Sequence, residues 1–258
     1  FPTRRSSDLA KKLGKTANGT IGMTVINGTP AILPCVHKSA PDLANGELVA
    51  YAPTAGNPQL RTLWKEKVFL KNPSLKGKNI SLPVIVPGLT AGISTLADLF
   101  LDADDALLAG DPSWDNYSLI IETRRGASLH QFPMFADGGF NLAAFEKAVA
   151  EEAEAGSVRM LLNFPQNPSG YSPTKAEAAA ILKVIKAQAD KGTKMLVCCD
   201  DAYFGLNYEA DIYPQSLFAE LADMSENILA VKIDGPTKED FVWGFRCGFL
   251  TFAGKGIS

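Results

Sequence analysis

Asp200 and Tyr203 are a carboxylate and a phenol in the run Asp200-Asp201-Ala202-Tyr203. The run follows Lys194–Cys199, a short apolar segment rich in strand-forming residues, which indicates a buried strand of a parallel sheet. In open α/β sheets, ligands bind just beyond the carboxyl ends of the strands. Both side chains could therefore point into one pocket and hold a polar ligand. Taken alone, they could equally be ordinary loop residues that cap the next segment.

Further polar side chains follow other apolar runs. Asn167 follows the expected strand 158–163, and its amide could donate to a ligand oxygen or merely close an Asx-turn. Lys238 and Arg246 follow the expected strand 228–233. A lysine amine is a nucleophile and a guanidinium binds anions with two parallel hydrogen bonds. A single lysine near a strand end is, however, usually a solvated surface residue.

A glycine turn and a tryptophan complete the set. Pro87-Gly88-Leu89-Thr90 lies between an expected strand at 82–86 and an expected helix. This arrangement presents free backbone N–H groups and a positive dipole end to an anion, although most such turns only reverse the chain. Trp114 follows the expected strand 106–110 and is either a core residue or a surface on which a flat ligand stacks.

Strand-length apolar runs alternate with helical patterns along the whole chain. We expect strands at 82–86, 106–110, 119–122, 158–163, 194–199, 228–233 and 248–252. The alternation predicts one α/β domain, a three-layer α/β/α arrangement with a mostly parallel central sheet and right-handed crossovers. The carboxyl ends of its strands would bring the residues described above to one edge of the sheet.

The expected helices have recognisable starts. Asn57 and Pro58 suit the cap and first position of a helix, and Asn141 suits the cap of another. Thr174 and Glu177 form a capping-box pattern. In the first of these helices, four apolar side chains fall on one face: Leu60, Leu63, Trp64 and Val68.

Composition narrows the class of protein. With 258 residues, 46% of them hydrophobic, the chain can bury a large core without staples. The net charge is −3, and charged residues of both signs are scattered along the chain without a basic stripe. No apolar run has the length of a membrane span. We therefore expect neither a nucleic-acid partner nor a membrane. No zinc spacing occurs, so we interpret the cysteines as reduced core residues of a cytoplasmic protein: Cys35, Cys198, Cys199 and Cys247.

The two ends of the sequence call for separate treatment. Residues 1–9 (FPTRRSSDL) resemble a translated cloning scar, lack the apolar region of a signal peptide, and are assigned no part in the fold. Residues 10–50 are expected to be an N-terminal segment that precedes the domain formed by 51–258. Within it, residues 18–33, with turn signals at Asn27-Gly28, are expected to wrap over another part of the protein rather than form a core element. Because the sequence stops straight after an apolar strand, we expect a fragment truncated at both ends.

The order and spacing of these residues resemble the fold-type I enzymes of pyridoxal 5'-phosphate, and most closely the class I/II aminotransferases. The resemblance runs from about Tyr51 to Phe252. Its most specific parts are Asn167-Pro-Ser-Gly170, the Asp200-x-x-Tyr203 pair, and Lys238 with Arg246 in Gly-x-Arg-x-Gly. It implies the fold of the PLP-dependent transferases, with 51–258 as the PLP-binding large domain and without the C-terminal small domain.

The resemblance also implies roles. Lys238 would attach covalently to the cofactor and, once displaced by an amino acid, would carry a proton. Asp200 would pair with the pyridine nitrogen and keep it protonated, and Tyr203 and Asn167 would hydrogen-bond the 3'-oxygen. Further contacts would be Trp114 on the ring face, Arg246 with Gly88, Leu89 and Thr90 at the phosphate, and Tyr51 at the phosphate of a neighbouring subunit in a homodimer.

The sequence departs from the pattern of this family in places. Gly235 stands where many relatives carry a phosphate-binding serine, so Thr237 or backbone groups would complete the phosphate site. Asp201 is a second candidate for the carboxylate that pairs with the pyridine nitrogen. The spacing to Tyr203 favours Asp200, and we expect Asp201 to point the other way. The arginine that grips the substrate carboxylate would lie in the absent domain, so this fragment alone would turn over poorly.

The activity implied by the resemblance is transfer of an amino group between an L-amino acid and a 2-oxo acid. A PLP-dependent carbon–sulfur lyase, which catalyses β-elimination, is the alternative among enzymes. A sensor domain of a transcription regulator is the alternative of another class, and the intact set of cofactor contacts argues against it. The identity of the amino donor and acceptor does not follow from the sequence.

Overall fold

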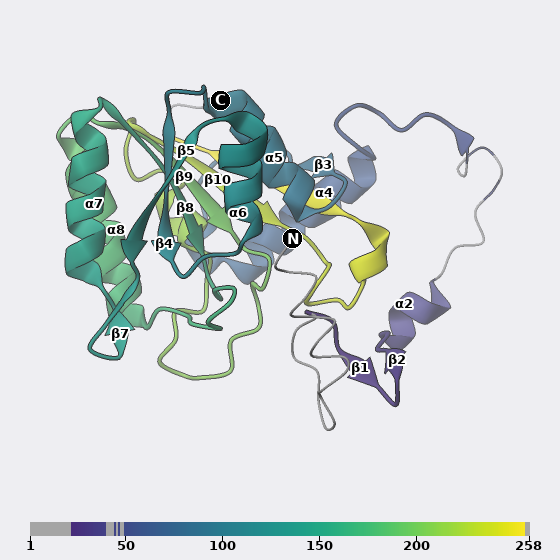
Figure 1. Cartoon of the computed structure of the whole chain (residues 1–258). Helices are drawn as coiled ribbons and strands as arrows, with labels where there is room; N and C mark the ends of the chain where they lie inside the picture. Colours follow the sequence, from purple (N-terminus) through teal and green to yellow (C-terminus); the bar gives the residue numbers. More distant parts are fainter. Residues whose placement is uncertain (1–21, 40–43, 45, 47–48, 256–258) are drawn as a thin grey trace.

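The computed structural model describes residues 22–39, 44, 46 and 49–255. Seven strands form the main sheet: β3 (Val84–Val86), β4 (Ala106–Asp111), β5 (Ser128–Pro133), β8 (Ser157–Asn163), β9 (Lys194–Asp200), β10 (Ile228–Asp234) and β11 (Gly248–Ala253). Their order is β3-β11-β10-β9-β8-β4-β5 (Figure 1). Strands β10, β9, β8, β4 and β5 run parallel, whereas β11 is antiparallel to both β10 and β3.

Helices cover both faces of the sheet. The residues that pack on one face come from α5 (Leu89–Phe100), α6 (Asn116–Ser118) and η2 (Leu119–Arg125). The other face carries α4 (Pro58–Lys71), α7 (Leu142–Glu154), α8 (Lys175–Asp190) and α9 (Leu217–Leu221). Further short elements are β1 (Val25–Ile26), β2 (Thr29–Pro30), α2 (Pro34–Lys38), η1 (Pro73–Leu75), β6 (Phe135–Ala136), β7 (Gly139–Phe140) and η3 (Trp243–Phe245). The predicted three-layer α/β/α fold with a mostly parallel sheet is confirmed.

Alternation along β9 decides which side chains reach which face. Val197 and Cys199 pack in the core with α7 and α8, whereas Cys198 packs in the core with α5. Successive side chains of a strand leave on opposite faces, so Asp200 continues on the α5 side and Asp201 on the α4 side. The prediction that Asp201 points away from Asp200 is confirmed.

The expected helix starts are present. Asn57 accepts a hydrogen bond from the Leu60 N–H at 3.0 Å, and Asn141 caps α7 in the same way. Thr174 and Glu177 form the capping box of α8. On α4, however, Trp64 and Val68 are buried while Leu60 and Leu63 remain 39% and 53% exposed, so the apolar face is only half covered.

The expected strand at 119–122 is wrong. These residues continue α6 into the helical turns of η2, where Ile120 and Ile121 are both buried in the core shared with α5. A short apolar run fits a buried helical turn as well as a strand, and periodicity alone does not separate the two. The edge strand beside β4 is β5, whose largely exposed residues give little apolar signal.

Outside the sheet, the structure bears on several other expectations. Asn27 and Gly28 form the turn between β1 and β2, both with positive φ, and the hairpin is exposed rather than part of the core.

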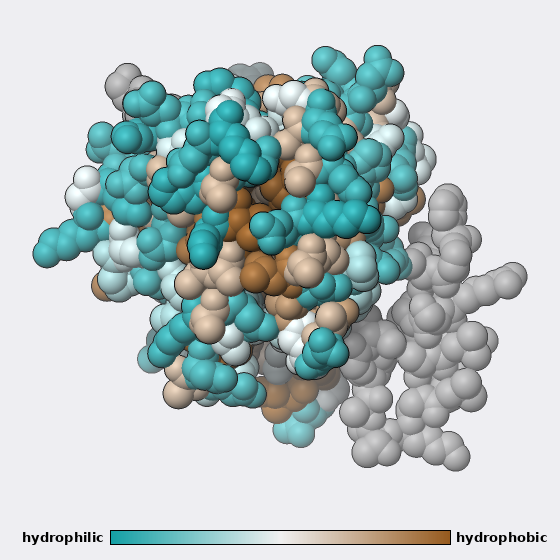
Figure 2. All heavy atoms as spheres, turned by 90° about the vertical axis from the view of Figure 1, so that its left-hand side faces the viewer, coloured by the Kyte–Doolittle hydropathy of each residue, from teal (hydrophilic) through white to brown (hydrophobic). Residues whose placement is uncertain are grey.

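The face that carries α7 and α8 is mostly hydrophilic, with apolar side chains showing in its middle (Figure 2). None of the helices in the described part of the chain has the length and apolar character needed to cross a bilayer. The presumed scar at residues 1–9 lies outside the described residues.

Candidate active site

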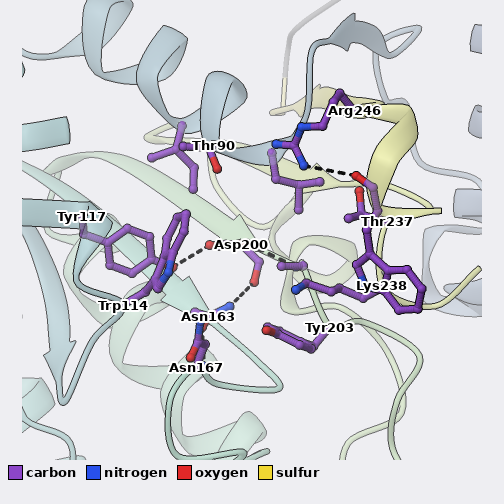
Figure 3. A pocket seen from close by; sticks show the side chains of 14 residues that line it. Thr90, Trp114, Tyr117, Asn163, Asn167, Asp200, Tyr203, Thr237, Lys238 and Arg246 are labelled. Atoms are coloured by element: carbon purple, nitrogen blue, oxygen red, sulfur yellow. Dashed lines mark hydrogen bonds between the residues drawn. The ribbon is translucent and has the colours of Figure 1, made fainter. Parts of the chain in front are cut away.

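A pocket of about 230 Å³ lies beyond the carboxyl ends of β4, β8, β9 and β10 (Figure 3). This is where open α/β sheets bind ligands. Its lining consists of Leu89, Thr90, Ile93, Trp114, Tyr117, Asn163, Asn167, Asp200, Ala202, Tyr203, Thr237, Lys238, Trp243 and Arg246. Sequence reasoning had singled out nine of these side chains as site residues or as a possible completion of the site, and the fold brings them together.

Asp200 forms the floor of the pocket, and only 3% of the residue is exposed. Tyr117 Oη donates a hydrogen bond to Asp200 Oδ2 at 2.5 Å, and the Ala202 N–H donates to Oδ1 at 3.2 Å. Burial raises the pKa of Asp200 to about 6, and these two hydrogen bonds act in the opposite direction. A cationic partner in the pocket would restore the fully ionised form at neutral pH.

Asn163, the last residue of β8, connects the neighbouring strand ends. Its Nδ2 donates to the backbone oxygen of Asp200 at 2.7 Å, and its Oδ1 accepts from the Asn167 N–H at 2.8 Å. Asn167 is therefore held at the pocket by its backbone. Sequence reasoning missed Asn163 and Tyr117, although a polar residue closing a buried strand and an aromatic residue next to Trp114 were the available signals.

Lys238 provides the amine. Its Nζ lies 5.0 Å from the centroid of the Tyr203 ring and donates to the Gly22 oxygen at 3.0 Å. Trp114 stands edge-on to Tyr117, with ring centroids 5.6 Å apart. The aromatic rings and the amine thus surround the space above Asp200, as Figure 3 shows.

The other end of the pocket is suited to an anion. Gly88 precedes α5 with φ 92°, and a Cβ at this position would come within 2.6 Å of Arg246 Nη2. The positive φ favours glycine at this position, and the missing Cβ leaves room for the guanidinium against the start of the helix. The N–H groups of the first helical turn, those of Leu89 and Thr90 among them, have no intrahelical acceptor. A cation and a helix N-terminus meet at one place.

The structure gives a reason for the glycine at position 235. A Cβ there would approach the Cys247 oxygen to 2.7 Å and Leu89 Cδ1 to 3.0 Å, so a serine would not fit this backbone. Thr237 lines the pocket instead, and its Oγ1 donates to the same Cys247 oxygen at 3.4 Å. Thr237 thus offers a hydroxyl at this end of the pocket, in addition to that of Thr90.

Tyr51 is the one proposed site residue that lies away from the pocket. Its side chain is fully exposed, and it is not among the residues that line the cavity of its own chain. The described residues of one chain therefore do not bring Tyr51 to the pocket with the other predicted site residues.

Comparisons with known proteins agree on one family. The family description "Aminotransferase class I and II" matches residues 23–253. The aspartate aminotransferase of Sulfurisphaera tokodaii is 21% identical over 97% of this chain and 59% of its own length. The LL-diaminopimelate aminotransferase of Dehalococcoides mccartyi is 28% identical over 96% of this chain and 62% of its own length. This chain thus spans about three fifths of the length of these relatives.

Solved structures share the fold. An aminotransferase from Anaerococcus prevotii superposes with a TM-score of 0.85 at 24% identity, covering 98% of this chain and 63% of that one. The N-succinyldiaminopimelate aminotransferase of Mycobacterium tuberculosis has a TM-score of 0.76 at 21% identity, with 96% and 60% covered. At these identities the likeness concerns the arrangement of the elements.

Proposed function

The chain belongs to the aminotransferase class I and II family, and we propose from this premise that it binds pyridoxal 5'-phosphate and transfers amino groups. The reaction would move an amino group between an L-amino acid and a 2-oxo acid. One observation carries the proposal: an amine, a buried carboxyl and an anion-binding end occupy separate walls of a single pocket. The relatives described above are named aminotransferases, and no observation favours a lyase or a sensor domain.

The residues present fit this cofactor, which belongs to the chemistry of the family. Its phosphate needs cations and free N–H groups, which Arg246 and the start of α5 supply. Its protonated pyridine nitrogen needs a carboxylate as a partner, and Asp200 supplies one. Asp200 is a desolvated carboxyl, and a cation beside it would favour its ionised form. Its aldehyde needs an amine, which is Lys238 Nζ, and Trp114 offers its flat ring a face.

Each side chain then has a distinct task. When bound, the cofactor supplies an aldehyde that takes up amino groups and a ring that accepts electrons. Lys238 would hold the cofactor covalently and, once free, its Nζ would carry the proton between the substrate Cα and the cofactor's C4' carbon. Asp200 would hold a proton on the ring nitrogen. Tyr203 and Asn167 would hydrogen-bond the 3'-oxygen.

The wider assignments are part of the same proposal. Residues 51–258 would be the PLP-binding large domain, preceded by an N-terminal segment at 10–50. The active form would be a homodimer in the cytoplasm, in which Tyr51 of each chain reaches the phosphate of the other. The exposed position of Tyr51 supports this arrangement.

A trapping experiment tests the proposal. The folded chain is titrated with pyridoxal 5'-phosphate while visible absorbance is recorded, then reduced with borohydride and mapped by peptide mass spectrometry. We expect the label on Lys238, and its loss in Lys238→Ala, because no other lysine lines the pocket among the described residues. Lys175→Ala, on the exposed start of α8, is the matched control and should keep the label. A label on another lysine, or none on a folded chain, would sink the proposal.

A further inference from the structure

Lys232 is a completely buried lysine that the proposed chemistry does not use. It lies on β10 with 0% of its surface exposed, on the face opposite the pocket. Its Nζ forms an ion pair with Asp201, lies 3.4 Å from Asp234 Oδ2, and stands 4.1 Å from the centroid of the Phe204 ring. A buried charge is tolerated only when it is paired, so the position of these partners matters.

The two carboxylates belong to the ends of the strands that carry the pocket residues. Asp201 directly follows Asp200, and Asp234 closes β10, four residues before Lys238. Because side chains alternate, Asp200 faces the pocket while Asp201 faces Lys232. The backbones are joined as well, since the Asp201 N–H donates to the Ile233 oxygen at 2.8 Å.

Neutral partners fix the two carboxylates from outside. Ser216 Oγ donates to Asp201 Oδ2 at 2.6 Å, and Trp64 Nε1 donates to Asp234 Oδ1 at 2.9 Å. Although burial disfavours the ammonium, the carboxylates of Asp201 and Asp234 raise the pKa of Lys232 above its ordinary value. Lys232 therefore stays charged and links β9 to β10 through its ion pairs with Asp201 and Asp234.

Helix α4 holds the same loop on its far side. Lys67 Nζ contacts Asp240 Oδ2 at 2.7 Å, and Lys71 forms an ion pair with Glu239. Both acids come directly after Lys238. The loop from 234 to 240 is thus anchored before Lys238 through Lys232 and after it through α4.

We propose that Lys232 is a positioning residue, whose buried ammonium ties Asp201 to Asp234 and so fixes Asp200 relative to Lys238. This inference rests on the proposed function, because it assigns the purpose of the link to the cofactor pocket. Stability alone is a weak explanation, since buried ion pairs are often matched by apolar side chains of similar size. The ion pairs of Lys232 join the ends of β9 and β10 directionally, and so set the position of Asp200 relative to Lys238. Apolar side chains would fill the same space without fixing that position.

The test uses a charge-balanced variant. Lys232→Met alone would leave two buried carboxylates without their cation, so Lys232→Met is combined with Asp201→Asn. The matched control is Lys78→Met with Asp223→Asn, which removes another ion pair, 2.8 Å long, away from the pocket.

Amide hydrogen exchange of the cofactor-free chain gives the first readout. We expect exchange about tenfold faster in the peptides covering 201–206 and 235–241 of the Lys232 variant, with 157–163 unchanged. The control should show no change in either loop. Unchanged exchange in the two loops would overturn the proposal.

The apparent Kd for pyridoxal 5'-phosphate gives the second readout. It should rise about tenfold in the Lys232 variant and stay constant in the control. A wild-type Kd in the folded variant would overturn the positioning role. If the unmodified chain binds no cofactor, the proposed function fails, and hydrogen exchange still decides whether Lys232 ties the two loops.

A milder variant covers the case in which the double variant does not fold. Asp234→Asn keeps the pair between Lys232 and Asp201 and retains an acceptor for Trp64 Nε1. Exchange should then accelerate in 235–241 and stay unchanged in 201–206. Equal exchange in wild type and Asp234→Asn would overturn the link to β10.

Discussion

The carboxyl of Asp200 meets opposite demands in the free and the ligand-bound protein. In the free protein its hydrogen-bond donors are Tyr117 Oη and the Ala202 N–H, neither of them a cation, and burial raises its pKa to about 6. A ligand with a cationic nitrogen would make the ionised form favourable again. A residue shaped for such a ligand therefore costs stability in its absence, as expected of functional sites.

We predict that Asp200→Asn stabilises the cofactor-free chain at neutral pH. The folded-state pKa of about 6 lies above the unfolded value, so the carboxyl's favourable contribution is complete below pH 4 and is lost as pH rises through 6. The loss is about 3 kcal/mol at most. The measurement is the free energy of unfolding by denaturant from pH 4 to pH 7.5. The free energy of unfolding of Asp200→Asn relative to that of wild type should increase over this interval.

The neighbouring aspartate is the control. Asp201→Asn removes the partner of a buried lysine and should destabilise the chain across the whole range. Asn at position 200 still accepts from the Ala202 N–H, and its amide can donate to Tyr117 Oη. If the free energies of unfolding of wild type and Asp200→Asn change in parallel with pH, burial does not raise the pKa of Asp200 and the prediction is wrong.

At the residue scale, sequence reasoning found side chains that follow strands and missed those that act through neighbours. Asp200, Lys238 and Arg246 were accessible because strand ends of a parallel sheet converge. Tyr117 was missed because it enters from α6, a short helix that was not predicted and that directly precedes the run 119–122 mistaken for a strand. The contact of Gly88 with Arg246 could not be predicted from the sequence, since it depends on the backbone conformation of both residues.

At the element scale, Glu177 joins the start of α8 to the β6–β7 hairpin. Its carboxylate accepts hydrogen bonds from the Thr174 N–H at 2.8 Å, the Phe140 N–H at 2.9 Å and Tyr171 Oη at 2.5 Å. Although partial burial alone would raise the pKa of Glu177, these donors lower it to about 2. The capping box is therefore also a tertiary junction.

We predict that Glu177→Gln costs about 1–2 kcal/mol at pH 7, because a charge-assisted acceptor of several donors is replaced by a neutral one. A depressed folded-state pKa gives stability that is present above pH 4.5 and lost as pH falls towards 2. The gap in unfolding free energy should therefore close in acid. Glu146→Gln, on the exposed face of α7, should show no such gap; a constant gap at all pH values would contradict the role of the charge.

Element prediction succeeded where length and capping agreed. Helices α4, α7 and α8 have polar caps followed by spaced apolar residues, and β8, β9 and β10 are apolar runs buried on both faces. The run 119–122 lacked such a boundary, and its burial against α5 suits either structure. Strand β5 is an edge strand with polar residues, so its place was set by pairing with β4 rather than by its own pattern.

At the scale of the whole molecule, the surface carries features that a single chain does not explain. Tyr51 is fully exposed, and Leu63 and Leu70 of α4 are 53% and 80% exposed. Singly exposed apolar residues are common, but here they accompany Tyr51, a proposed site residue that does not line the pocket of its own chain. A two-fold dimer would give each Tyr51 the pocket of its partner.

We predict that mixing two inactive variants restores cofactor binding. Tyr51→Ala should bind pyridoxal 5'-phosphate weakly, since its pockets lack the tyrosine, and Lys238→Ala should form no covalent attachment. In a hybrid dimer, one pocket receives Lys238 from the first chain and Tyr51 from the second, and is complete. Random exchange of chains makes half of the dimers hybrid, so about a quarter of all pockets should bind as tightly as wild type.

The measurement is borohydride-stable labelling at a cofactor concentration that fills wild-type pockets and leaves those of Tyr51→Ala largely empty. Subunits are exchanged by mild denaturation and refolding, and label is counted by intact-protein mass, which separates the two variants. The label should appear on the Tyr51→Ala chain, because that chain carries Lys238. Mixing Lys238→Ala with Arg246→Ala tests specificity, since Lys238 and Arg246 line the pocket of the same chain and no hybrid pocket can be complete. If the first mixture labels no more than its separate components, Tyr51 acts within its own chain or not at all.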